Sequence, residues 1–303
     1  MKNVTRNNRI KNSRSDFIVD IFIYGILGLA ALIVAYPLWF VVIASFSDPG
    51  AVLTGRVTFF PVGFTLAGYE MVFENTAIWR GYANTIFYTV VGTTISIFLT
   101  LTIAYPLSRK SFSGRHAIMT FLVITMYFGG GLIPTFMLMR NLGLVNTRAV
   151  MVLMGAIGVF NVIITRVFLE SSMSGDLEEA AAIDGCSPIR FFISCVIPLS
   201  KPIIAVLALF YGVGHWNDFM RALIYLRSAD MYPLAMILRS ILIQADIGAA
   251  IMDDGTMDLV ERIRLAEQIR YVVIIVSSLP MLVLFPFIQK YFNKGVMLGS
   301  LKG

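Results

Sequence analysis

The chain has 303 residues, of which 57% are hydrophobic and only 14% are charged, and its net charge is +6. Soluble domains carry about 25% charged residues, so this composition excludes a soluble globular enzyme and a disordered protein. About 20 apolar residues cross a bilayer as a helix, whereas barrel strands are about ten residues long with alternating polarity. The pattern therefore predicts an all-α polytopic membrane protein. Six stretches lack Asp, Glu, Lys and Arg: 21–47, 81–108, 116–139, 149–165, 202–217 and 271–289.

These stretches predict six transmembrane helices within one domain, residues 17–288. The third helix contains Gly129-Gly130-Gly131 followed by Pro134. Three glycines lower helix propensity, and a membrane tolerates such a break only where protein or water satisfies the backbone. We therefore expect the break to face the interior of the bundle. The predicted helices are, in order, about 17–46, 82–107, 117–139, 150–165, 202–226 and 271–288.

The basic residues predict the orientation. The tail at 1–16 carries five of them directly before the first apolar run, and that run is too long for a signal peptide, whose apolar region is about 7–15 residues. Positively charged segments stay in the cytoplasm, so both tails, 1–16 and 289–303, are predicted to be cytoplasmic. All seven lysines then fall inside. The connection at about 170–200 is cytoplasmic, and a long segment at about 227–270 is outside.

The sequence contains no recognisable catalytic or metal-binding pattern. His116 and His215 are assigned to opposite sides of the membrane, and no H-E-x-x-H, G-x-S-x-G or phosphate-binding loop occurs. Cys186 and Cys195 lie in the cytoplasmic connection, where thiols stay reduced, and without partner histidines they do not form a zinc site. If transport is coupled to ATP, another chain must bind the nucleotide.

The cytoplasmic connection carries the clearest local signals. Asp176 and Glu179 have the spacing of a capping box, which predicts the start of a helix. Gly185 is placed to stop that helix, and Ser187-Pro188 is typical of the start of a second one. Two short helices joined at a glycine form a compact projecting element. From these residues alone, a surface loop that packs on its own bundle stays an equal alternative.

The same connection resembles the EAA loop of ABC importer permeases. Its pattern is Glu179-Ala180-Ala181, three further residues, Gly185, and Pro198 thirteen residues later. Cys195 and Ile197 stand where that family usually has isoleucine and leucine.

Two further patterns resemble the carbohydrate-uptake permeases related to the maltose system. One is Trp216-Asn217-Asp218-Phe219, and the other is the tail from Gln289 to Gly303. The segments that resemble the LplC/YtcP-type branch are Gly129–Gly131, Pro134, Asn141-Leu142-Gly143-Leu144 and Gly214-His215-Trp216-Asn217.

The resemblance implies the binding-protein-dependent ABC permease fold in a bacterial cytoplasmic membrane. The chain would be a permease subunit of an ATP-driven oligosaccharide importer, not an enzyme. Its partners would be a second homologous permease, two ATP-binding cassette ATPase subunits and an extracellular solute-binding protein that contacts the segment 227–270. No cofactor is expected in this chain, since ATP and Mg would bind the partner ATPase, and no nucleic acid is involved.

The resemblance also implies two sets of contacts with the ATPase. The EAA loop would be a coupling helix in a cleft of the ATPase, with Glu179 paired with basic residues there. The C-terminal tail would add secondary contacts through Lys294, Gly295 and Lys302. The residues assigned to coupling are Glu178, Glu179, Ala180, Ala181, Asp184, Gly185 and Pro198.

The candidate substrate pathway lies on the fifth predicted helix, at His215, Trp216, Asn217, Asp218 and Arg221. Ionisable residues within a membrane helix are functional candidates, and tryptophan with polar neighbours suits a sugar. An equal alternative is that Asp218 and Arg221 pair at i, i+3 and tie helices together.

Asn161 in the fourth predicted helix is a weaker candidate. An interhelical hydrogen bond there is favoured over a ligand contact.

Two other classes of membrane protein make different predictions for the sequence. A self-contained secondary carrier would be expected to show an internal repeat, and none is visible. An intramembrane hydrolase would need a base beside a nucleophile. His215 near Asp218 is the only pair in the sequence from which such a catalytic site could be built. The outside segments hold ten arginines and eleven carboxylates, so bulk charge leaves a neutral sugar and a uronate equally open.

Overall fold

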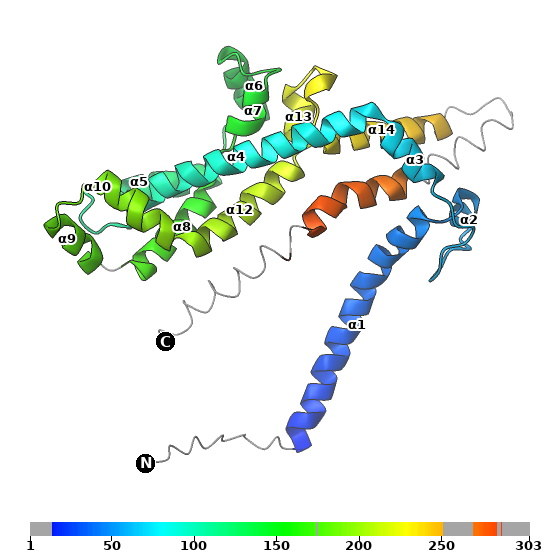
Figure 1. Ribbon diagram of the computed structural model, residues 1–303, viewed down its shortest axis with the longest axis horizontal. Coiled ribbons are helices and arrows are strands. Elements are labelled where there is room, and N and C mark those ends of the chain that lie inside the picture. Colours follow the sequence, from blue (N-terminus) through cyan, green and yellow to red (C-terminus); the bar gives the residue numbers. More distant parts are fainter. Residues whose placement is uncertain (1–13, 174, 251–268, 284–285, 287–303) are drawn as a thin grey trace. The chain divides into compact units, whose positions relative to one another are not determined.

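The computed structural model describes residues 14–173, 175–250, 269–283 and 286. Predictions for the rest of the two tails and for residues 251–268 of the outer segment lie outside this part. The described residues form helices joined by turns, as predicted (Figure 1). They divide into two compact units: the first holds the described residues within 14–69 and 269–275, and the second holds those within 70–250 and 276–286.

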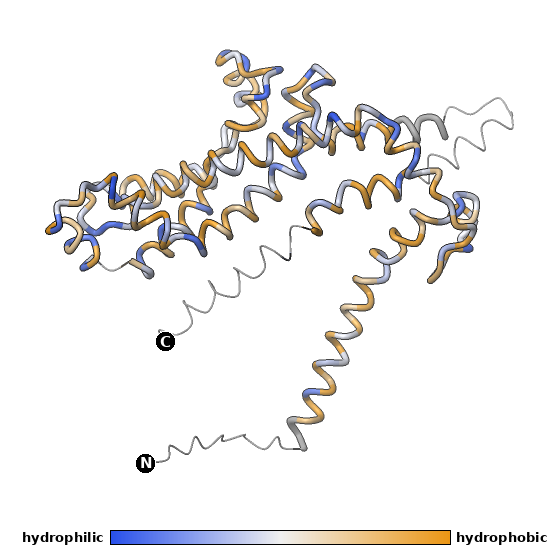
Figure 2. The backbone as a smooth tube through the Cα atoms, viewed as in Figure 1, coloured by the Kyte–Doolittle hydropathy of each residue, from blue (hydrophilic) through white to orange (hydrophobic). Residues whose placement is uncertain are grey.

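The first unit is dominated by α1 (Arg14–Ser45), which confirms the first predicted helix. Its apolar residues are exposed along most of the helix, and Figure 2 shows hydrophobic residues along most of its length. A helix that is apolar all round suits lipid contact. After α1 the chain folds back through α2 (Pro49–Leu53), whose first turn is capped by the Asp48 carboxylate, and continues towards α3 (Ala67–Glu74).

The second unit is built around α4 (Thr76–Ser108), which is longer than the predicted 82–107. Three helices pack along α4: α8 (Val159–Ser172), α12 (Lys201–Trp216) and α14 (Leu234–Ala250) (Figure 1). The buried face of α4 is rich in small and hydroxyl residues, which let helices approach closely inside a membrane. The remaining described helices are α5 (Arg115–Tyr127), α6 (Leu132–Asn141), α7 (Arg148–Leu153), α9 (Gly175–Ile183), α10 (Pro188–Phe191), α11 (Ile197–Leu199), α13 (Met220–Tyr225) and the helix over 269–283.

The third predicted helix is two helices rather than one. α5 ends before the glycine run, and α6 leaves it at an angle of 114°. Gly131 has a φ of +84°, a conformation that favours glycine. The predicted break is therefore confirmed, and the prediction of a single helix over 117–139 was wrong.

The fourth and fifth predicted helices are also interrupted. The prediction of 150–165 is replaced by α7 and α8, which are separated at Gly155, where φ is +74°. The prediction of 202–226 is replaced by α12 and α13. Asp218 lies at this second break and its carboxylate accepts a hydrogen bond from the backbone N–H of Arg221, so a side chain takes over a donor at the start of α13.

The number of spans is only partly visible. Within the described residues, two helices are long and apolar enough to cross a membrane, Phe17–Ser45 and Thr76–Ser108. Two bent pairs raise this number to four if each is one span: α5 with α6, and Pro188–Leu199 with α12, which is bent by 76°. The total of six stays a prediction.

Candidate functional site

The connection between α8 and α12 folds as two short helices, as its sequence predicts. α9 begins at Gly175, so Asp176 lies in the first turn, and its assignment as the capping residue was wrong. The C-terminal end is as predicted. Gly185 has a φ of +73°, its N–H donates to Ala182, and the N–H of Cys186 donates to the carbonyl of Ala181. These two bonds form a Schellman motif.

The second helix of the connection starts at Ser187, whose hydroxyl accepts a hydrogen bond from the N–H of Arg190 at 3.3 Å. Pro188 occupies the first helical position, which proline tolerates. The helix then passes through a π-helical turn, Phe192–Val196, to Pro198 in α11. Proline lacks the N–H that would close the preceding α-helical turn, so its position fits this local irregularity.

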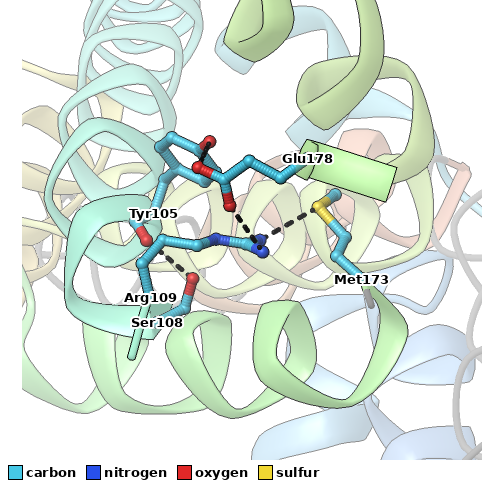
Figure 3. Close-up of polar contacts among 5 residues, drawn as sticks. All are labelled: Tyr105, Ser108, Arg109, Met173 and Glu178. Carbon is cyan, nitrogen blue, oxygen red and sulfur yellow. Dashed lines mark hydrogen bonds and ion pairs between the residues drawn. The ribbon is translucent and has the colours of Figure 1, made fainter. Parts of the chain in front are cut away.

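Glu178 points towards the end of α4, as Figure 3 shows. Its Oε2 lies 3.3 Å from Nη1 of Arg109, and its Oε1 accepts a hydrogen bond of 3.4 Å from the Tyr105 hydroxyl. Arg109 also places Nη2 at 3.5 Å from the sulfur of Met173. Glu178 therefore engages α4 of its own chain, whereas the sequence placed it among the ATPase contacts without distinction from Glu179.

The opposite face of α9 is exposed. Glu179, Ala180, Asp184 and Gly185 are exposed and Ala181 is half-buried, while the side chain of Ile183 is 87% exposed. α9 also borders a hollow of about 830 Å³. The hollow is lined by residues of both charges from four elements, among them Arg109, Lys110, Arg115, Arg166, Glu170, Glu178 and Glu179.

Two of the candidate pathway residues are buried in helix contacts. His215 is 7% exposed and lies against Gly92 of α4. Trp216 is also 7% exposed, and its indole N–H donates to the carbonyl of Ser277 at 3.1 Å. These two side chains contact neighbouring helices in the described structure.

The other three residues of this group lie at the break between α12 and α13. The Asp218 carboxylate forms an ion pair with Nε of Arg221 at 3.0 Å. Nη1 of Arg221 also donates a hydrogen bond to the carbonyl of Met151 at 2.9 Å. The i, i+3 pair that the sequence offered as an alternative is therefore present. Asn217 is exposed, and its amide donates to the carbonyl of Val213.

Asn161 is buried in the first turn of α8. The interhelical hydrogen bonds beside it are formed by Tyr211. The phenol of Tyr211 in α12 accepts from the N–H of Gly158 at 3.0 Å and lies 2.7 Å from the hydroxyl of Thr100 in α4. Sequence reasoning missed Tyr211 and Arg109. A polar aromatic within an apolar helix and an arginine directly after a span were the available signals.

Side chains of α4 form hydrogen bonds with the backbone at the start of the outer segment. The Asn84 amide donates to the carbonyls of Asp230 and Tyr232 at 2.7 and 3.1 Å, and the Tyr88 hydroxyl donates to the carbonyl of Met231. Residues 230–232 therefore have a defined position on α4.

The C-terminal candidates Lys294, Gly295 and Lys302 lie outside the described residues. Within the described residues, no group of three or more His, Cys, Asp or Glu side chains is placed to hold a metal ion.

Comparison with known proteins identifies the family. Over 292 residues, which cover 96% of this chain and 97% of the relative, the chain is 38% identical to Protein LplC of Bacillus subtilis (strain 168). It is 39% identical over 289 residues, 94% of this chain and 98% of the relative, to the polygalacturonan/rhamnogalacturonan transport system permease protein YtcP of the same organism. The chain belongs to the permease subunits of the carbohydrate ABC importers.

A solved structure supports this assignment of the permease. The crystal structure of a bacterial ABC transporter involved in the import of the acidic polysaccharide alginate matches with a TM-score of 0.83 and 32% identity, covering 93% of this chain and 99% of that chain. No protein-family model matches the chain.

The permease is therefore a non-catalytic subunit of a membrane transporter for sugars or oligosaccharides. The resemblance to the LplC/YtcP-type branch is confirmed, and the secondary carrier and the intramembrane hydrolase are excluded.

Proposed function

We propose that this permease forms one half of the translocation pathway of an ATP-driven oligosaccharide importer in a bacterial cytoplasmic membrane. Its six spans would place both tails in the cytoplasm. A second homologous permease would complete the pathway, two ATPase subunits would bind ATP and Mg, and an extracellular solute-binding protein would deliver the sugar to the segment 227–270. The tail residues Lys294, Gly295 and Lys302 would add contacts with the ATPase.

The observation that carries the coupling role is the exposed face of α9. Ile183 is 87% exposed, and Ile189, four residues after Gly185 in α10, is 74% exposed. Large apolar side chains that gather on a surface mark an interaction site. Glu179 and Asp184 lie beside them and are exposed, so the partner surface that fits this face is apolar with basic groups at its rim.

The test is purification of the whole importer after a charge change on this face. We expect Glu179→Lys to abolish ATP-driven uptake and to reduce copurification of the ATPase, because it places a positive charge against basic partners. Gly185→Leu should act similarly, because a side chain at a φ of +73° disrupts the turn that ends α9. Membrane insertion should survive in both variants.

Glu74→Lys is the matched control, since Glu74 is an exposed carboxylate at the end of α3. It should assemble and transport like the wild type. Normal uptake by the Glu179→Lys importer would reject the coupling role of α9.

We further propose that the sugar is an acidic oligosaccharide. The named substrates of two similar proteins support this class, since one relative is named for polygalacturonan and rhamnogalacturonan and the solved transporter for acidic alginate. In the reconstituted importer with its binding protein, oligogalacturonates should stimulate ATP hydrolysis, whereas neutral galacto-oligosaccharides of equal length should not. Stimulation by the neutral sugars alone would reject this assignment.

For the pathway, we propose that Asn217 contacts the sugar while His215, Trp216, Asp218, Arg221 and Asn161 shape the wall around it. Support comes from the exposure of Asn217 and the burial of His215 and Trp216. Asn217→Ala should raise the sugar concentration that half-saturates ATPase stimulation without lowering thermal stability. An unchanged half-saturating concentration would remove Asn217 from the pathway.

A further inference from the structure

Arg109 is a buried cation at the end of a membrane helix. It is the first residue after α4 and is 9% exposed. Its guanidinium lies 4.9 Å from the centre of the Tyr105 ring. Nε is buried and has no hydrogen-bond partner among the described residues. A buried arginine is tolerated when an opposite charge and hydrogen bonds compensate the loss of water.

That opposite charge comes from α9. The carboxylate that the structure places on Arg109 is Glu178, at 3.3 Å, and its side chain is 40% exposed. Glu170 lines the same hollow, but it pairs with Arg166 one turn away in α8, at 2.8 Å. The residues that line the hollow therefore form one ion pair within α8 and one that joins α9 to the end of α4. Figure 3 shows the second pair.

The Arg109–Glu178 pair joins α9 to the helix around which the second unit is built. Much of α9 is exposed, with Ala181 packed against the core near Leu107. If a partner moves α9, Glu178 either carries the end of α4 with it or leaves Arg109 buried without a carboxylate. The second outcome is the costlier one, so α4 is expected to follow. Because α8 and α12 pack along α4, the movement reaches the helices of the pathway.

We propose that Arg109 is a positioning residue that orients the coupling helix through Glu178 and transmits the movement of α9 to α4. This inference rests on the proposed coupling role of α9. Since Glu178 is turned towards α4, its part in coupling is exerted through Arg109, whereas Glu179 and Ile183 form the surface offered to the ATPase.

The experiment uses the complete importer in proteoliposomes and measures ATP molecules hydrolysed per oligosaccharide transported. Arg109→Gln and Glu178→Gln should each raise this ratio by about fivefold or more, the lower range of a typical coupling between sites. The ATPase should still copurify, since the exposed face of α9 is unchanged. Arg109→Lys keeps the charge without the guanidinium fork and should give an intermediate ratio.

The matched controls are Arg166→Gln and Glu170→Gln, which break the ion pair within α8 beside the same hollow. They should keep the wild-type ratio, because the two residues pair with each other inside α8 and their ion pair does not join α9 to α4. If their ratio rises as much as that of Arg109→Gln, general weakening of the hollow explains the effect and the proposal is overturned.

The double variant Arg109→Gln/Glu178→Gln separates the roles of the two residues. If Glu178 acts through Arg109, the double variant should have the same ratio as each single one. Additive effects would show that Glu178 contacts the ATPase directly, and they would overturn the proposal. If the Arg109→Gln importer fails to assemble, the Glu178→Gln variant tests the proposal instead, because the Glu178 side chain is half-exposed. A wild-type ratio of ATP hydrolysed to sugar transported in that variant also overturns the proposal.

The two proposals fail differently. A wild-type importer that does not copurify with an ATPase would reject the proposed function. A wild-type importer that hydrolyses ATP and transports, together with an assembled Arg109→Gln variant of unchanged ratio, would reject only the role of Arg109.

Discussion

The imidazole of His215 lies directly on the backbone of Gly92. A Cβ added to Gly92 would come within 2.5 Å of Nε2 and within 2.6 Å of Cε1, and both residues are buried on facing sides of α4 and α12. Contacts this short do not occur at real Cβ atoms, so glycine is required at position 92 as long as the His215 side chain keeps this position. The close packing of α4 against α12 therefore depends on glycine at position 92.

Gly92→Ala should therefore destabilise the permease. Overpacking in a core costs about 1–3 kcal/mol, and we expect a lower unfolding temperature of the detergent-solubilised importer. Gly214→Ala is the control, since a Cβ at Gly214 meets nothing within 4 Å. Adding His215→Ala to Gly92→Ala should restore part of the loss. An unfolding temperature equal to that of the wild type would show that α4 and α12 are not packed this closely.

Tyr211→Phe should also lower stability. It removes the hydroxyl that accepts from the N–H of Gly158 and bonds Thr100, and an unpaired buried donor costs about 1–3 kcal/mol. Thr100→Val should cost less, because the bond from Gly158 survives. Tyr127→Phe, at a side chain that is 74% exposed, is the control. Equal unfolding temperatures for Tyr211→Phe and Tyr127→Phe would contradict this role.

Arg221→Lys should weaken the joint between α7 and α13. One lysine ammonium does not reproduce the fork that reaches the Asp218 carboxylate and the Met151 carbonyl together. We expect a loss of about 1 kcal/mol, the usual contribution of one hydrogen bond, measured by thermal unfolding. Arg227→Lys, at an exposed position, should be neutral. If both substitutions behave alike, the fork contributes nothing measurable.

Asn146 should tolerate glycine better than alanine. Its φ is +60°, and its side-chain oxygen accepts from the N–H groups of Arg227 and Ser228 at 2.9 and 3.0 Å. Both variants lose these bonds, but Asn146→Gly also removes the Cβ from the left-handed region, whereas Asn146→Ala keeps it there, at about 1 kcal/mol more. Hydrogen exchange at residues 226–232 should rise in both variants, and further in Asn146→Ala. Identical exchange in the two variants would mean that the backbone strain is negligible.

The class of protein and the local structure of the EAA loop follow from the amino-acid sequence alone. A charge content far below that of soluble domains required a membrane, and the EAA pattern with the Trp216–Phe219 segment indicated the family that the comparisons show. The stop at Gly185 and the start at Ser187 were predictable because capping depends on neighbours within four residues. α1 was predictable for a related reason, since its apolar character is continuous along the helix.

The breaks within the fourth and fifth predicted helices, and the contacts between residues distant in the sequence, depend on the packing of the folded chain. The breaks at Gly155 and Asp218 lie in or beside apolar runs whose hydropathy gives no sign of them. Arg221 bonds a carbonyl that lies 70 residues away in the chain, and such a bond depends on how helices pack. The contacts Arg109–Glu178 and Gly92–His215 also depend on helix packing. Hydropathy predicts that a residue is buried, but the residue that it contacts depends on how helices distant in the sequence pack together.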